Sequence, residues 1–132
     1  MNDRVTPAKD GKAVVEQFYT AVMTGSLDDF LALTHPDIEV HVPANLPWGG
    51  VHRTAESFWN LFPKIGAMIN SASFKVLDIY GEGDRVFATV TADTIDGHSL
   101  IVGEDWRVRE GRIDWVRVYY FDSRPIINLS AA

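Results

Sequence analysis

Residues 97–122 are the most strongly patterned part of the chain and read GHSLIVGEDWRVREGRIDWVRVYYFD. Two long strand-like runs are joined at Glu110-Gly111, where the glycine permits the positive φ that a tight hairpin needs. The second run alternates with the two-residue period of a β-strand. One face carries Ile113, Trp115, Arg117, Tyr119 and Phe121, and the other carries Asp114, Val116, Val118, Tyr120 and Asp122. Because both faces hold aromatic residues, we expect neither face to be purely solvated.

Acidic residues lie among large apolar ones in this hairpin. Glu104 and Asp105 stand beside Trp106, and Asp122 directly follows three aromatic residues at 119–121. A carboxylate between bulky rings is costly unless it is paired, hydrogen-bonded or protonated. We therefore expect the hairpin to form the floor of a pocket that the earlier elements cover.

The composition predicts one soluble domain over residues 1–132. The chain is 46% hydrophobic and 11% aromatic, carries a net charge of −6 and has no cysteine. Such an acidic chain is a poor candidate for binding nucleic acid or an anionic membrane, and without cysteine it has no disulfide or thiolate nucleophile. No apolar run approaches the ~20 residues of a membrane span. We expect a cytoplasmic protein whose residues 1–10 form a frayed leader.

Helical patterns fill much of the first half. An apolar stripe begins near Lys12 and can end at Gly25. Ser26 can cap a second short helix, and Thr54 can cap a third. Pro63 should end or kink the third helix, because proline cannot donate the backbone hydrogen bond.

Strand patterns follow. Alternation predicts a strand over 38–42, which runs into the loop PANLPWGG at 43–50. Further strands are predicted over 74–80 and 86–95, and Asp96-Gly97 is a strong hairpin signal. With the hairpin described first, this order indicates an α+β domain in which helices pack on one face of a curved antiparallel sheet.

Several of these segments resemble one family. The Phe18-Tyr19 helix, the segment HPDIEVHVP…PWGG over 35–50 and the closing GRIDWVRVYYFD over 111–122 resemble the SnoaL-like branch of the nuclear transport factor two-like superfamily. Ketosteroid isomerase and limonene epoxide hydrolase share that fold. The resemblance covers roughly residues 10 to 127. It implies a cone-shaped barrel of a curved antiparallel sheet, with three N-terminal helices on its concave face. It also implies one apolar pocket and a homodimer that packs through the sheet.

Comparison with ketosteroid isomerase concerns the EDWRV segment. This segment resembles the strand that carries the acid of that enzyme's oxyanion hole, which implies a protonated carboxylic acid at Glu104. The partner tyrosine and the base of the isomerase are replaced by Phe18 and Val42.

Comparisons with two other activities concern the remaining acids. For limonene epoxide hydrolase, Asp93 matches one acid, while Thr91 and Val118 stand where the arginine and the second acid would be. SnoaL-type cyclases use an aspartate near the end of the last strand as acid/base, and Asp122 is the nearest residue.

Each candidate has a plain structural alternative. Asp122 is a general acid/base or a strand-end residue that caps the following turn. Glu104 faces the pocket as donor or base, or it forms a cross-strand salt bridge with an arginine of the hairpin. His41 transfers protons or lies on the outer face of its strand. Asp93 lines the pocket or faces water.

The expected ligand-binding wall is mostly aromatic. Trp48 is the strongest candidate, because its Gly/Pro loop could close the mouth of the cone. Large aromatic residues also serve as core or dimer contacts. The full set expected to bind substrate is Tyr120, Trp106, Trp48, Asp93, Tyr19, Trp59 and Val118.

No metal or cofactor is predicted. The four histidines lack metal-ligand spacing, and neither a phosphate-binding loop nor a G-x-S-x-G elbow is present. We interpret the chain as a binder of an apolar, cyclic small molecule that performs cofactor-free cyclisation, isomerisation or dehydration with Asp122, Glu104 and His41. A non-catalytic binding module and an epoxide hydrolase are the alternatives, so the sequence leaves open whether the protein is an enzyme.

Overall fold

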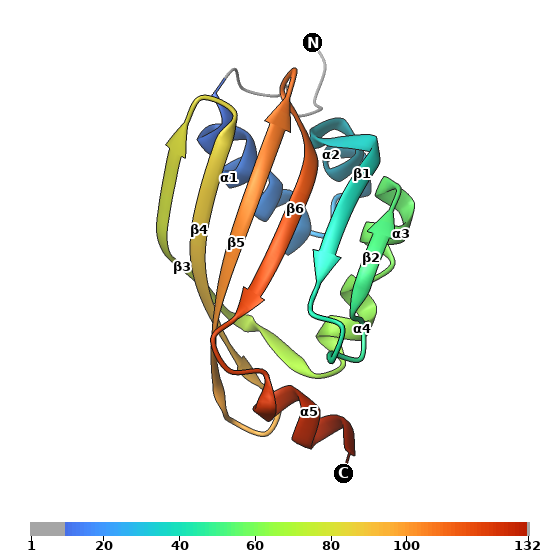
Figure 1. Cartoon of the computed structure of the whole chain (residues 1–132), viewed down its shortest axis with the longest axis vertical. Helices are drawn as coiled ribbons and strands as arrows, with labels where there is room; N and C mark the ends of the chain where they lie inside the picture. Colours follow the sequence, from blue (N-terminus) through green and yellow to red (C-terminus); the bar gives the residue numbers. More distant parts are fainter. Residues whose placement is uncertain (1–9, 132) are drawn as a thin grey trace.

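The computed structural model describes residues 10–131 as a curved six-stranded sheet with helices on its concave face (Figure 1). The strand order is β2-β1-β6-β5-β4-β3, and the two edge strands do not meet, so the cone is open. The helices are α1 (Gly11–Met23), α2 (Leu27–Leu33), α3 (Ala55–Trp59), α4 (Phe62–Gly66) and α5 (Arg124–Ala131). The strands are β1 (Thr34–Val42), β2 (Gly50–Arg53), β3 (Ile69–Glu82), β4 (Arg85–Thr94), β5 (Ser99–Arg109) and β6 (Arg112–Tyr120). The predicted α+β class is confirmed.

The β5–β6 hairpin forms as the sequence predicts. Glu110 and Gly111 have φ of 54° and 78°, which are the two left-handed residues of a type I′ turn. The inner face of β6 carries Val116 and Val118, while the outer face carries Trp115 and Arg117. Every ladder in the sheet is antiparallel except that of β1 with β6. This one parallel pairing was not predicted.

The first two helices begin with side-chain caps, of which only the one at Ser26 was predicted. Asp10 accepts a hydrogen bond from the backbone N–H of Ala13 at 2.8 Å, and Ser26 accepts one from Asp29 at 3.3 Å. Gly25, with a φ of +68°, separates α1 from α2. The predicted leader lies outside the described residues apart from Asp10. These caps satisfy helix N–H groups that would otherwise lack partners.

The third predicted helix is divided in two. Thr54 caps α3 through a hydrogen bond from the Ser57 N–H at 3.1 Å, as expected. The helix stops at Trp59, and Pro63 lies in the first turn of α4, where a missing N–H costs nothing. Within residues 10–131, four helices therefore precede β3 instead of the predicted three.

A bulge near the start of β3 shapes the wall of the sheet. The register between β3 and β4 shifts between Asn70 and Lys75. Ser73 Oγ accepts a hydrogen bond from the Asp93 N–H at 2.7 Å and donates one to the Asn70 carbonyl oxygen at 2.5 Å. The bulge bends the strand and places Phe74 against Tyr19 of α1, with ring centroids 5.4 Å apart.

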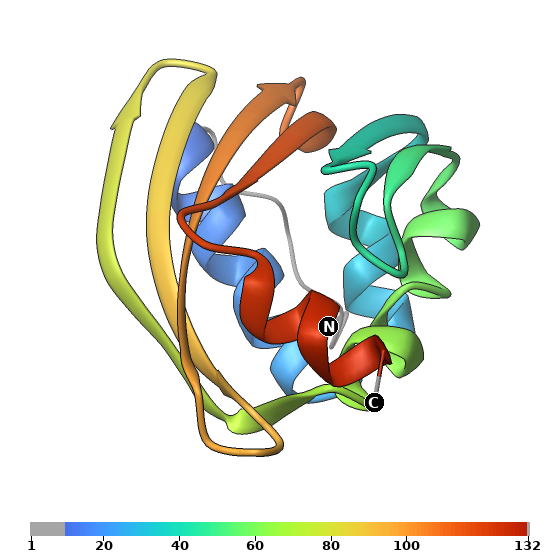
Figure 2. The same ribbon diagram turned by 60° about the horizontal axis from the view of Figure 1, so that its bottom comes forward.

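Two elements were not predicted, namely β2 and α5. Figure 2 shows α5 crossing one end of the cone. Asp122 accepts a hydrogen bond from the Arg124 N–H at 3.1 Å, so it caps the turn that leads into α5. Ile126 of α5 is fully buried in the main core. From the sequence, residues 123–125 (SRP) were interpreted as a turn after the last strand, and the helix that follows was not predicted.

Candidate functional site

An apolar pocket of about 350 Å³ lies between the concave face of the sheet and the helices. Its volume is within the range of small-molecule sites. Most of the lining side chains are aliphatic or aromatic, and they come from α1, α3, α4, five strands and the 43–49 loop. The lining residues are Phe18, Tyr19, Val22, Met23, Val40, Val42, Trp48, Phe58, Leu61, Phe62, Ile65, Gly66, Ile69, Ser71, Phe74, Val90, Ala92, Leu100, Val102, Glu104, Trp106, Val116, Val118 and Tyr120.

The pocket opens to solvent between the end of α1, α4 and the start of β3. The lining residues Met23, Gly66 and Ser71 are exposed there. At the opposite side, Val40, Val116 and Trp106 are buried in the core. A ligand therefore has a path from solvent to the aromatic interior.

Glu104 is the carboxylic acid inside this pocket. It lies on the inner face of β5, and its Oε1 accepts a hydrogen bond from the Tyr19 hydroxyl of α1. Burial raises the pKa of Glu104 to about 7, while the hydrogen bond from Tyr19 opposes that rise. Burial, and then the charge of Glu104, raise the pKa of Tyr19 well above its ordinary value. Tyr19 therefore stays neutral and donates the hydrogen bond. Near pH 7, both the ionised and the protonated form of Glu104 are populated.

Ring packing holds the pair in place. The Tyr19 ring meets Trp106 edge to face, with centroids 5.9 Å apart, and Trp106 also packs against Phe18 at 5.0 Å. Trp106 is 2% exposed, so its indole has little freedom to move. Its Nε1 is a buried donor without a hydrogen-bond partner in residues 10–131. A ligand oxygen near Nε1 would satisfy this donor.

Tyr120 and Trp48 form a second polar position in the pocket. Burial, followed by the charge of Glu104, raises the pKa of Tyr120, and the Trp48 side chain opposes the rise. Trp48 enters the core because its loop closes tightly: a side chain at Gly49 would collide with the Pro43 carbonyl oxygen. The Trp48 carbonyl oxygen accepts a hydrogen bond from His52 Nε2 at 2.8 Å. The indole position is therefore fixed by its own loop.

The structure places Asp122 outside the pocket. Its carboxylate accepts hydrogen bonds from Nε and Nη2 of Arg124 at 2.9 and 2.8 Å. These bonds lower the pKa of Asp122 to about 2. The inward alternation of β6 ends at Tyr120, so the chain has turned before Asp122 is reached. The expectation that this acid faces the pocket is not met.

His41 also lies away from the pocket. It is on the outer face of β1, where its ring centroid is 5.3 Å from that of Trp115. Its Nε2 is 3.6 Å from Glu39. The alternation with Val40 and Val42, both of which line the pocket, accounts for the outward position.

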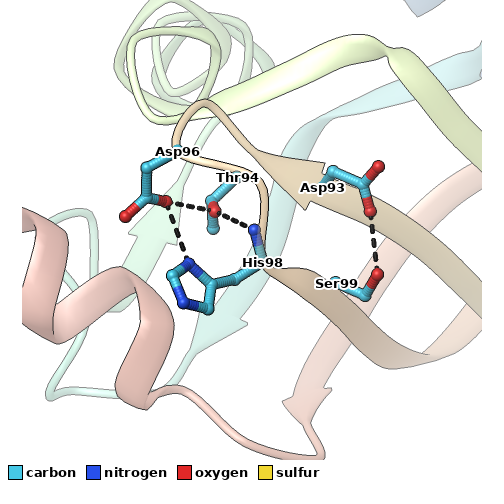
Figure 3. A network of polar contacts seen from close by, with 5 residues as sticks. All are labelled: Asp93, Thr94, Asp96, His98 and Ser99. Atoms are coloured by element: carbon cyan, nitrogen blue, oxygen red, sulfur yellow. Dashed lines mark hydrogen bonds and ion pairs between the residues drawn. The ribbon is translucent and has the colours of Figure 1, made fainter.

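Asp93 and Trp59 are not lining residues either. Figure 3 shows Asp93 next to the turn of the β4–β5 hairpin, where Ser99 Oγ donates a hydrogen bond to its Oδ1 at 3.0 Å. The same hairpin holds Asp96 against His98 at 3.3 Å. Trp59 packs against Phe30, with centroids 4.9 Å apart. The remaining predicted wall residues, Tyr19, Trp48, Trp106, Val118 and Tyr120, do line the pocket.

Two features of the site were not predicted from the sequence. They are the pairing of Tyr19 with Glu104 and the contribution of α4 and β3 to the pocket wall. Tyr19 was expected as a wall residue only, because 85 positions separate it from Glu104. Ser71 and Phe74 reach the pocket through the bulge, for which the polar NSAS sequence at 70–73 was the available signal. Across residues 10–131, no cluster of three potential metal ligands is present. Within the same residues, no helix is long and apolar enough to cross a bilayer.

Known proteins resemble this chain in both sequence pattern and fold. The profile of the SnoaL-like domain matches residues 15–121. None of the curated proteins matches the sequence.

Three solved structures with the same fold are an NTF2-like protein, TerC and IdmH. The NTF2-like protein is from Burkholderia thailandensis and is 22% identical, with a TM-score of 0.76 over 95% of this chain and 99% of that one. TerC, co-crystallised with polyporic acid, is 16% identical, with a TM-score of 0.73 over 91% and 97%. IdmH from Streptomyces antibioticus, described as a candidate polyketide cyclase, is 18% identical, with a TM-score of 0.69 over 91% and 97%. At these identities the likeness concerns the fold alone, but the profile covers most of the sequence. The chain belongs to the SnoaL-like family.

Proposed function

We propose that this chain binds an apolar, cyclic small molecule in the pocket and exchanges a proton with it through Glu104. The observation that carries the proposal is one carboxyl group among apolar walls, held by a hydrogen bond from Tyr19. With a pKa of about 7, this group is available near neutral pH both as a base and as an acid. The description of IdmH as a candidate polyketide cyclase favours a cyclic ligand.

The reaction needs only groups that the pocket already holds. The Glu104 carboxylate accepts a proton from the ligand and, once protonated, returns it at another position. Isomerisation, cyclisation and dehydration can all follow from such a transfer. Tyr19 fixes one carboxyl oxygen. Tyr120 also lines the pocket, and in this proposal its hydroxyl donates to a ligand oxygen on which negative charge develops. A positioned acid/base typically contributes ~10²–10⁴-fold to the rate.

Two rival functions use the same fold. A non-catalytic binder would retain the ligand without turnover, and Glu104 would serve only to anchor it. An epoxide hydrolase of the limonene type requires an arginine in the cavity, but none of the lining residues is arginine, and Asp93 lies outside. We therefore retain the first rival and leave the second aside.

The experiment begins with the protein purified under native conditions and any retained small molecule identified by mass spectrometry. Turnover of that molecule, or of its close analogues, is then measured for the wild type and for Glu104→Gln. Asp122→Asn is the matched control, since it also removes a carboxylate but at the surface. The proposal expects loss of turnover only in Glu104→Gln. Retention of the molecule without any turnover in the wild type favours the non-catalytic binder.

We also propose that the protein is a homodimer and that it is cytoplasmic. The outer face of the sheet exposes Phe87, Ile101 and Tyr119 at 43%, 46% and 47% of their surface. Phe87 packs over Gly103, and Gly103 pairs with Tyr119, so these side chains form one patch. We propose that two copies pack through this patch, because apolar patches of this kind commonly mark interfaces.

A further inference from the structure

The charge of the pocket is one-sided. Among the lining residues Glu104 is the only carboxylic acid, and none is lysine, arginine or histidine. The exposed residues at the opening, Met23, Gly66 and Ser71, are uncharged as well. An anionic ligand would therefore leave water for a site that offers it no positive charge and places a carboxylate nearby.

One oxygen of Glu104 is available to a ligand. Within residues 10–131 the carboxyl has a single hydrogen-bond partner, the Tyr19 hydroxyl, which binds Oε1. Oε2 has no hydrogen-bond donor among the described residues, although Tyr120 and Trp106 also line the pocket. A buried carboxylate is costly unless its oxygens are paired or it is protonated. The missing partner is a hydrogen-bond donor, and a charged donor would stabilise the carboxylate most.

The rings around Glu104 favour a positive charge. Tyr19, Phe18 and Trp106 pack against one another beside the carboxyl, and Phe74 completes that side of the pocket. Aromatic faces attract ammonium groups, and tryptophan attracts them most strongly. A carboxylate inside an aromatic wall is thus complementary to an organic cation. The net charge of −6 on the whole chain would also draw cations toward the protein.

We propose that the ligand of this pocket is a lipophilic amine, whose ammonium group donates a hydrogen bond to the free oxygen of Glu104, and that the pocket rejects anions. This inference rests on the proposed function, because it names the class of molecule that enters the same pocket. The rest of the ligand occupies the apolar wall formed by β4, β5 and β6.

The test uses three ligands of one shape that differ in charge. They are 2-naphthylmethylamine, 2-naphthalenemethanol and 2-naphthoate, and their affinities are measured by calorimetry at pH about 8.5. At this pH the Glu104 carboxyl is ionised and an alkylamine is still mostly protonated. We expect the amine to bind about tenfold tighter than the alcohol, and the naphthoate at least about tenfold more weakly.

The variant Glu104→Gln tests the cause of the preference. It keeps an acceptor for Tyr19 but removes the charge, so the amine and the alcohol should bind with affinities within about twofold of each other. Asp122→Asn, the surface control, should keep the wild-type order. An amine preference that survives in Glu104→Gln overturns the inference, as does a wild-type protein that binds naphthoate as tightly as the amine.

A pH series on the wild type gives a second readout that requires no variant. The titratable groups that face Glu104 are Tyr19 from α1 and Tyr120 from β6, and both stay neutral over this range. Acidification from pH about 8.5 to about 5.5 should weaken amine binding about tenfold or more and leave the alcohol unchanged. Equal pH dependence for both ligands contradicts the inference while leaving the proposed function intact. If none of the three ligands binds, the inference fails, while the proposed function is still decided by the turnover of the retained molecule in the wild type and in Glu104→Gln.

Discussion

The Tyr19 hydroxyl of α1 donates a hydrogen bond to Oε1 of Glu104 on β5, across 85 positions of sequence. This bond joins the helical layer to the concave face of the sheet inside the pocket. It is an internal polar contact between a neutral phenol and an acid whose pKa lies near 7.

Replacing Glu104 with glutamine should change how stability depends on pH. The folded-state pKa of Glu104 is about 7, above the ordinary value of 4.5. A raised pKa contributes stability below pH 4.5 that is lost as the pH rises through 7. Glu104→Gln has no carboxyl to ionise, so it should not show this loss. As the pH rises from about 4.5 to about 8, the free energy of unfolding of the variant should increase by up to about 3 kcal/mol relative to that of the wild type. Urea titrations at both pH values measure the difference, and parallel curves for the two proteins would refute it.

Replacing Tyr19 with phenylalanine should raise the pKa of Glu104 further. The tyrosine hydrogen bond favours the ionised carboxyl and is the contribution that lowers its pKa. Carbon-13 NMR of the Glu104 carboxyl, followed against pH, reports the midpoint directly. Tyr80→Phe is a suitable control, because it removes an exposed hydroxyl far along β3. A midpoint that falls in Tyr19→Phe is the contrary result.

Replacing Ser73 with alanine should destabilise the bulge that forms the pocket wall. Its hydroxyl has two partners, the Asp93 N–H and the Asn70 carbonyl oxygen. Loss of both hydrogen bonds should lower the free energy of unfolding by about 1–3 kcal/mol. The control is Ser99→Ala, which removes a single exposed hydrogen bond to Asp93 on the same hairpin (Figure 3) and should cost less than about 0.5 kcal/mol. Equal losses of stability in the two variants would show that the bulge does not depend on Ser73.

Replacing Tyr119 with glutamate should separate the proposed homodimer into monomers. The charge would lie in the outer patch beside Phe87 and Gly103, where burial between two copies would leave it unpaired. Light scattering coupled to size exclusion gives the mass. Val51→Glu, an exposed apolar residue on β2 at the far edge of the sheet, is the control. A wild type that is monomeric at high concentration removes the dimer proposal.

The sequence predicted the architecture well because its signals were local. The β5–β6 hairpin follows from two-residue alternation and from one glycine with positive φ. The caps at Ser26 and Thr54 likewise depend on residues three positions apart. The α5 helix is amphipathic but was not predicted, because Ser123, Arg124 and Pro125 were interpreted as a turn. The β2 strand was not predicted because four residues are too few for a periodic pattern.

The candidate site was predicted less well, because it depends on where a strand stops and on contacts between distant elements. Asp122 has the alternation of an inward residue, but β6 ends two positions earlier and Arg124 captures its carboxylate. His41 follows the simple alternation of β1 and lies outside. Tyr19 was placed in the pocket, but its bond to Glu104 depends on how α1 lies over the sheet. No local pattern in the sequence encodes that placement.

The most direct test of Glu104 as the proton-exchanging group is a carbon-13 NMR titration of its carboxyl in the ligand-free protein. A carboxyl held in an apolar pocket beside neutral tyrosines should titrate at about 7. A midpoint at the ordinary value of 4.5 would mean that this acid is solvated, and the pocket would then lack the proton-exchanging group on which its proposed chemistry depends.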